Sequence, residues 1–216
     1  MPSDSGLQQA VIDELTWEPR VTAAHIGVTA ASGVVALTGH VGSYAEKHAA
    51  EIAAGRVKGV LAVADELEVR LSFETKRTDE ELAAAALDRL SWDVSLPRDA
   101  IHPRVDHGWV TLTGEVDFHY QRELAREDVR RLIGVVGISD QLTIRPRVDV
   151  PNVSDDITHA LHRSWFFDPA TVKVTAAGGM VRLTGTVQSY HERQVAAETA
   201  WAARGVTDVQ NDLTVI

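Results

Sequence analysis

The feature that most constrains this chain is a strand-like motif that occurs three times. Each copy alternates apolar residues with small or polar ones and places a glycine at the same step. The copies are Val35-Ala36-Leu37-Thr38-Gly39-His40-Val41, Val110-Thr111-Leu112-Thr113-Gly114-Glu115-Val116 and Val181-Arg182-Leu183-Thr184-Gly185-Thr186-Val187. Self-similarity at a fixed period indicates one structural unit repeated along the chain.

A second glycine follows the first at a constant distance in every copy. It stands in the pairs Gly59-Val60, Gly134-Val135 and Gly205-Val206, so the spacing (59 − 39, 134 − 114, 205 − 185) is 20 residues each time. A seven-residue apolar pattern comes next, with Asp65, Asp140 and Asn211 at its third position. Two anchors and a pattern, kept three times, show that the repeat is not accidental.

Each copy predicts the element order α-β-β-α-β. Apolar residues at helical spacing, such as Leu7, Val11 and Leu15, indicate an opening helix. Ser32-Gly33 is a turn signal between two strands. Capping boxes are indicated by the pairs Ser5 with Gln8, Thr78 with Glu81, Ser43 with Glu46, and Ser189 with Glu192. Gly59, Gly134 and Gly205 stand where a helix-ending glycine belongs.

The alternation within the central strand gives one apolar face and one mostly polar face. A sheet with such strands is covered on one side only, and two helices on the apolar face are the simplest cover. The predicted fold class is therefore α+β: three tandem α-β-β-α-β modules, each a small three-stranded mixed sheet with two helices on one face. We expect the modules at residues 5–71, 78–146 and 153–216.

Composition narrows the classes of function. A net charge of −10 argues against nucleic acid as a partner, because such binders concentrate Lys and Arg. With no cysteine, thiolate catalysis and thiolate metal sites are excluded. No stretch approaches the roughly 20 apolar residues of a transmembrane helix. The first residues lack the basic and apolar regions of a signal peptide, so we expect a cytoplasmic protein, or a periplasmic one if a presequence has been removed.

The module order, with V-x-L-x-G-x-V before a helix and G-V-x-x-V-x-[DN]-x-L-x-V after it, resembles the BON domain, a family named for bacterial OsmY and nodulation proteins. The resemblance covers all three copies and nearly the whole chain. It implies a bacterial protein linked with osmotic or envelope stress. It also implies a domain that binds phospholipid or other hydrophobic partners without catalysis.

The repeated polar and glycine positions have structural interpretations. Gly39, Gly114 and Gly185 lie inside a strand, where glycine costs stability unless something passes close by. We expect a helix to approach them; a ligand close to the backbone is the alternative. We interpret Asp65, Asp140 and Asn211 as clasps to a nearby turn, since Asn in one copy shows that charge is not required there.

Nine histidines raise the question of a metal. His159 and His162 are three residues apart on a predicted helix, and His191 belongs to the same module. We expect a solvated helix face, with a metal-dependent hydrolase as the alternative. We assign no catalytic, metal-binding or cofactor-binding residue, and we expect no cofactor.

The aromatic residues supply the candidate contact site. Trp17 and Trp92 each lie 22 residues before the strand glycine (39 − 17, 114 − 92), which predicts a core or inter-module role. The third module has Trp165-Phe166-Phe167 in this region, and we expect at least one ring to form a contact with a membrane, a protein or another module. The predicted function is a non-catalytic binding protein for phospholipid, a hydrophobic ligand or a protein; a self-associating structural adaptor is the alternative.

Overall fold

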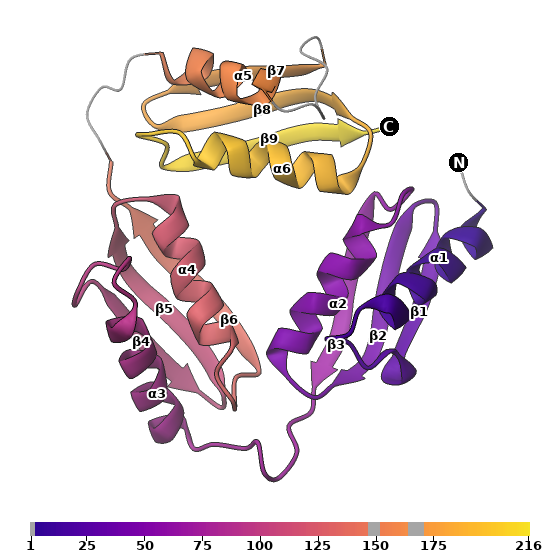
Figure 1. Ribbon diagram of the computed structural model, residues 1–216, viewed down its shortest axis with the longest axis vertical. Helices are drawn as coiled ribbons and strands as arrows, with labels where there is room; N and C mark the ends of the chain where they lie inside the picture. The colour runs from indigo at the N-terminus through magenta and orange to yellow at the C-terminus, as the bar shows by residue number, and fades with distance from the viewer. Residues whose placement is uncertain (1–2, 147–151, 164–170) are drawn as a thin grey trace. The chain divides into compact units, whose positions relative to one another are not determined.

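The computed structural model describes residues 3–146, 152–163 and 171–216, which form three modules (Figure 1). The first contains α1 (Asp4–Trp17), the 3-10 turn η1 (Ala23–His25), β1 (Ile26–Ala31), β2 (Val34–Val41), α2 (Tyr44–Arg56) and β3 (Ala62–Val69). The second contains α3 (Asp79–Trp92), β4 (Ile101–Asp106), β5 (Trp109–Val116), α4 (His119–Arg130) and β6 (Gly137–Ile144). The third contains α5 (Val153–Arg163), β7 (Val172–Ala177), β8 (Met180–Val187), α6 (Tyr190–Trp201) and β9 (Asp208–Val215).

Every module has a three-stranded sheet with its second strand in the centre, in the orders β1-β2-β3, β4-β5-β6 and β7-β8-β9. In the first and third modules, the first strand pairs antiparallel with the centre and the last strand pairs parallel. Both helices of a module lie on the same face of its sheet (Figure 1). The predicted fold class is therefore confirmed.

The buried faces of the helices and the central strand meet in one core per module. In the first module, Leu7, Val11 and Leu15 of α1 pack in one cluster with Val35 and Leu37 of β2. In the third module, the same roles fall to Ile157, Leu161, Val181 and Leu183. Because the side chains of a strand alternate between faces, the residues between these core positions point to the opposite face of each sheet.

The glycine of the central strand is required by the neighbouring strand, and the expected approach of a helix is wrong. Gly39, Gly114 and Gly185 have φ values of +110°, +130° and +126°. A Cβ at Gly114 would lie 1.9 Å from the carbonyl oxygen of Ala100, the residue just before β4. The corresponding distances are 2.2 Å to the His25 oxygen from Gly39 and 1.9 Å to the Thr171 oxygen from Gly185. Only glycine fits this backbone and this close approach.

The second recurring glycine does not end the helix directly. The last helical residues are Arg56, Arg130 and Trp201, so the glycines at 59, 134 and 205 follow after three or four residues. They have φ values of +100°, +102° and +82°, which places them in the left-handed region within the turn that leads to the last strand. The expectation of a glycine at the helix C-terminus is therefore wrong, because a short turn separates each helix from its glycine.

One of the four predicted capping boxes is complete, two form only in the half made by the N-cap serine, and one is wrong. Thr78 and Glu81 form a complete capping box, and Ser43 and Ser189 accept the backbone N–H groups of Glu46 and Glu192. The wrong prediction is that of α1, whose N-cap is Ser3, not Ser5. Gln8 donates instead to the carbonyl oxygen of Val28 at 2.7 Å, so it links the helix to β1.

Candidate functional site

The end of the first helix exposes a tryptophan in two modules. Trp17 is 84% exposed and Trp92 is 82% exposed, so neither belongs to the core of its module. The core interpretation of these residues is wrong, and their inter-module role stays a prediction. Because the two rings recur at the same position and are exposed in both modules, each is a candidate contact site.

The helix geometry explains the exposure of these rings. In α1 the buried residues are Leu7, Val11 and Leu15, and Trp17 comes two residues after the last of them. Two residues correspond to about 200° around the helix axis, so Trp17 points away from the core. Trp92 follows Leu90, the last buried residue of α3, by the same step. This offset in the helical pattern was the sequence signal that could have predicted exposure.

A buried carboxylate holds the helix end beside Trp17. Glu18 Oε1 accepts a hydrogen bond from Arg20 Nε at 2.7 Å, and Glu18 Oε2 accepts one from Arg56 Nη2 at 3.0 Å. Hydrogen bonding from Arg20 lowers the pKa of Glu18 to about 2. The carboxylate is therefore ionised at neutral pH, and it ties α1 to α2 at the point where Trp17 emerges.

In the second module, more apolar surface surrounds the tryptophan. Val94, two residues beyond Trp92, is 99% exposed, and Leu87 on α3 is also exposed. A surface depression here is lined by Leu87, Leu90, Ser91, Leu96, Pro97, Arg98, Asp99 and Ile101. The second module therefore offers an exposed ring and a mainly apolar hollow, the latter lined in part by residues of the same helix, α3.

The candidate contact residues of the third module, Trp165, Phe166 and Phe167, lie outside the described residues. The prediction that one of their rings forms a contact therefore stays a prediction. Their place in the sequence, just after α5, matches the part of the module where Trp17 and Trp92 are exposed.

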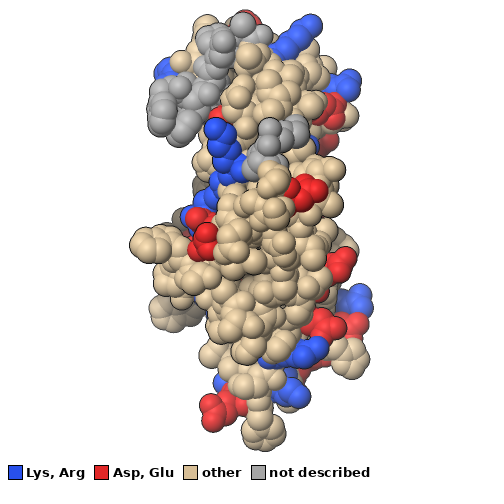
Figure 2. Space-filling model, turned by 90° about the vertical axis from the view of Figure 1, so that its right-hand side faces the viewer, with Lys and Arg blue, Asp and Glu red and all other residues tan. Residues whose placement is uncertain are grey.

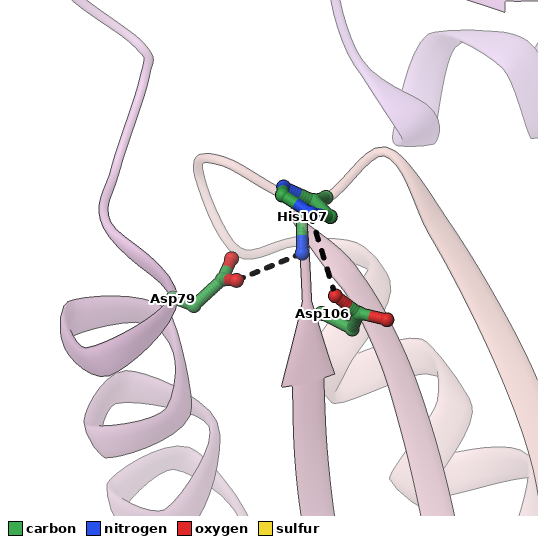
Figure 3. A group of neighbouring side chains, drawn as sticks. All are labelled: Asp79, Asp106 and His107. Atoms are coloured by element: carbon green, nitrogen blue, oxygen red, sulfur yellow. Dashed lines mark hydrogen bonds and ion pairs between the residues drawn. The ribbon is translucent and has the colours of Figure 1, made fainter.

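Within the described parts of the chain, one group of three neighbouring residues has side chains of the types that bind metal ions. Ligand atoms of Asp79, Asp106 and His107 lie within 4.8 Å of one another (Figure 3). Asp79 is already engaged, because its two oxygens accept the backbone N–H groups of His107 and Gly108 at 2.8 and 2.9 Å. We therefore interpret the group as a clasp that joins the start of α3 to the β4–β5 turn.

The Asp79 clasp predicts a pH-dependent stability. The N–H groups of Gly108 and His107 lower the pKa of Asp79 below its ordinary value. The stabilisation is therefore fully present above about pH 4 and is lost as the pH falls through the lowered pKa. We expect Asp79→Asn to lower the stability of the second module at neutral pH and to have a much smaller effect in acid.

Amide hydrogen exchange at His107 and Gly108, measured against pH, checks this expectation. Asp4→Asn is the matched control, because Asp4 accepts only the N–H of Ser32 at the same place in the first module. Equal exchange rates in the wild type and Asp79→Asn at neutral pH would contradict the clasp.

Comparison with known proteins agrees with the repeated geometry. The family model described as "BON domain" matches the chain three times, over residues 3–70, 78–146 and 149–216. The chain belongs to the BON domain family. Osmotically-inducible protein Y of Escherichia coli (strain K12) is 30% identical over an alignment of 130 residues, which covers 52% of this chain. The match spans 60% of that protein, which is less than two thirds of its length.

Two solved structures of CdsD, a structural protein of the type III secretion system of Chlamydia trachomatis, also match the BON chain. One is 16% identical and covers 96% of this chain and 91% of its own, with a TM-score of 0.27. The other, of the C-terminal domain, is 16% identical and covers 97% of each chain, with a TM-score of 0.28. TM-scores this low establish neither a shared arrangement nor a shared function.

The recurring Asp or Asn of each BON module protects the free edge of the last strand. Asp65 Oδ1 accepts the N–H of Leu67 at 3.0 Å, and Lys47 Nζ of α2 donates to the carbonyl oxygen of Leu67 at 2.6 Å. In the third module, Asn211 accepts the N–H of Leu213 at 3.3 Å. The clasp is thus to the strand's own backbone, and the expected clasp to a nearby turn is wrong.

The same edge contact is completed by cations of the second helix. Arg193 of α6 donates to the carbonyl oxygens of Leu213 and Asn211 at 3.1 and 2.8 Å. In the second module, Asp140 Oδ1 accepts the N–H of Leu142 at 3.0 Å, and Arg126 of α4 lies 3.8 Å from Asp140. A strand edge with occupied backbone groups is a poor template for another strand. The residue types alone do not indicate this role, because the role depends on which backbone groups face outward.

The remaining candidate residues of the BON chain do not converge on a reaction centre. His159 and His162 are exposed on α5, and neither belongs to the Asp79 group. On the face seen in Figure 2, blue and red side chains are interspersed and no broad blue area forms. Among the described residues, no helix combines the length and apolar content needed to cross a bilayer.

Proposed function

We propose that this BON-domain protein is a non-catalytic binding protein that contacts phospholipid surfaces through the ends of its first helices. One observation carries the proposal: Trp17 and Trp92 occupy the same position in two modules, and both are more than four-fifths exposed. Tryptophan is suited to a lipid–water boundary because its ring is apolar and its N–H remains available to water or headgroups. A hydrophobic small molecule or a protein is the alternative ligand.

The binding energy expected for a single ring indicates that several rings must contact the bilayer together. Burying one aromatic side chain contributes about 1.5–3 kcal/mol, which is too little to hold a protein on a bilayer. Several such sites on one chain act together, because the first contact raises the effective concentration of the others. The net charge of −10 opposes anionic lipid, so we expect binding to anionic vesicles to strengthen with added salt.

We expect the double substitution Trp17→Ser, Trp92→Ser to weaken vesicle binding by about tenfold or more for each ring. The measurement is partitioning of the intact protein into phosphatidylcholine vesicles, with far-UV circular dichroism to verify the fold. Trp109→Ser is the control, since Trp109 is a half-exposed tryptophan that contacts Gly137 within its own sheet. Equal loss of binding in the double variant and in Trp109→Ser would contradict the proposal.

The absence of catalysis is part of the proposal. Its support is that the recurring polar residues are engaged by backbone groups: Asp65 and Asn211 at the strand edge, and Asp79 at the turn. A substrate whose turnover is abolished by replacing a single His or Asp would contradict it. The weaker alternative, a metal-dependent hydrolase, predicts bound metal in the protein purified from its own host.

The biological setting is proposed from the similarity to osmotically-inducible protein Y. We propose a bacterial osmotic or general stress role in the cytoplasm, with the periplasm as the alternative compartment. Protein abundance before and after an osmotic upshift, measured in fractionated host cells, tests both the role and the compartment.

A further inference from the structure

The first strand of each module is the other edge of its sheet, and its outward backbone groups can be identified. In the third module, the β7–β8 turn is a two-residue hairpin in which Ala177 pairs with Met180. The N–H of Thr186 donates to the carbonyl oxygen of Thr171 at the far end of the pair. Bonded pairs alternate in an antiparallel ladder, so Val172, Val174 and Ala176 direct their N–H and C=O groups to the free edge.

In the first module, this edge is protected by contacts within the module. Val28 is the counterpart of Val174, because the two pair with the equivalent residues Leu37 and Leu183. Its carbonyl oxygen accepts the hydrogen bond from Gln8 of α1 at 2.7 Å. The N–H of Ile26, at the start of the same edge, donates to the carbonyl oxygen of Ala23 in η1.

In the second module, the same edge is protected by the residues of the strand itself. Pro103 pairs with Leu112 and so stands at the position of Val28 and Val174. Proline has no N–H to offer, and edge strands are where it is tolerated. The neighbouring Arg104 adds a charge, which also discourages strand pairing.

The third module lacks the proline of the second module, and its described residues lack the Gln8-type hydrogen bond of the first. Its strand is Val172-Lys173-Val174-Thr175-Ala176-Ala177, with no proline and one charge. The position of Gln8 is taken by Ser154 (39 − 8 and 185 − 154 both equal 31). Among the residues that the structure describes, no side chain bonds to the outward groups of Val174. The opposite edge of this sheet, β9, is occupied by Arg193 and Asn211.

We propose that β7 is a self-association site, at which two copies of this chain pair their β7 strands antiparallel to form a continuous six-stranded sheet. Because β9 is protected, β7 cannot pair with β9 of the next copy, so the contact closes as a symmetric dimer and no filament grows. The register that pairs all three outward residues of both copies places Val174 opposite Val174 of the second copy and Val172 opposite Ala176.

This register is electrostatically acceptable. It places Lys173 opposite Thr175 of the second copy, twice, so no like charges face each other. Over residues 152–163 and 171–216, five Lys or Arg residues stand against six Asp or Glu residues, although the whole chain carries −10. The charge of the module that would meet its copy is therefore nearly balanced, and local self-repulsion is weak.

The register gives a charge test at a single exposed position. Thr175→Arg places Arg opposite Lys173 in both symmetric pairs, and we expect the dimer Kd to rise about tenfold or more. Thr175→Glu places a carboxylate there, and we expect the Kd to fall. Thr29→Arg is the matched control, because Thr29 is the equivalent exposed residue of the protected strand β1.

Sedimentation velocity of the intact chain measures the Kd, and amide hydrogen exchange locates the contact. We expect a reversible dimer of the wild-type chain and slower exchange at Val172, Val174 and Ala176 as its concentration rises. This measurement on the wild type does not require the Thr175→Arg variant to fold. A wild type that remains monomeric overturns it, as does protection of these amides that is independent of concentration. Equal Kd values for Thr175→Arg and Thr29→Arg also overturn it. None of these results depends on the tryptophans of the proposed lipid contact.

Discussion

Replacing Gly114 with valine should lower the free energy of unfolding of the second module by about 2–4 kcal/mol. Two effects act in the same direction. At φ = +130° a side chain is strained. The added Cβ would also lie 1.9 Å from the Ala100 carbonyl oxygen, a backbone atom that cannot rotate out of the way. Urea denaturation, followed by hydrogen exchange at the β5 amides, measures the loss.

Alanine at position 114 separates this explanation from simple overpacking. The clash begins at Cβ, so Gly114→Ala should be destabilising as well, and the same substitution at Gly39 and Gly185 should behave alike. Gly178→Ala is the matched control: Gly178 has φ = +58°, but an added Cβ there would meet nothing within 4 Å. If Gly114→Ala were no more destabilising than Gly178→Ala, the close carbonyl would not be the reason for the glycine.

Replacing Arg89 with leucine should also destabilise the second module, by about 2–3 kcal/mol. Asp128 of α4 is only 5% exposed, and its Oδ1 accepts two hydrogen bonds from Arg89 of α3 at 2.9 and 2.7 Å. Leucine leaves this carboxylate buried without its partner, a change that costs about 3–5 kcal/mol at fully buried sites. The smaller value expected here reflects the half-exposed Arg89 side chain, beside which water can reach the carboxylate.

The double variant Arg89→Leu, Asp128→Leu shows whether the stability lost in Arg89→Leu comes from an unpaired buried charge or from lost packing. Removing both charges removes the buried carboxylate, so we expect the double variant to recover most of the stability lost in Arg89→Leu. Urea denaturation of the single and double variants forms the thermodynamic cycle. Additive losses would show that the pair is not coupled. The first module links its helices with the charges reversed, through Glu14 of α1, Glu18 at the C-cap of α1, and Arg56 of α2.

The sequence was sufficient for the fold because the repeat supplies each pattern three times. Alternating residues such as Val35 and Leu37 predicted the central strand, and the spacing of Leu7, Val11 and Leu15 predicted the helix that covers it. The same spacing predicted which residues are buried, since these side chains pack in one core cluster.

Features that depend on where a side chain points, or on which backbone atoms lie beside it, were not predicted. The recurrence of tryptophan at positions 17 and 92 indicated only that this position has a role. Whether the ring is exposed depends on its angle around the helix axis. Gln8 has the right place for a capping box, yet α1 begins earlier and the side chain reaches Val28. The roles of Gly114 and Asp65 depend on which backbone atoms lie beside them, and residue types alone do not specify that.

The most direct test of the central claim is flotation of the intact protein with phosphatidylcholine vesicles, with tryptophan emission recorded on the floated fraction. The account predicts that the protein floats with the vesicles and that its emission shifts to the blue, because Trp17 and Trp92 leave water. It also predicts that the Trp17→Ser, Trp92→Ser variant stays at the bottom of the gradient. Wild-type protein that remains at the bottom with unshifted emission, on both zwitterionic and anionic vesicles and at low and high salt, would contradict it.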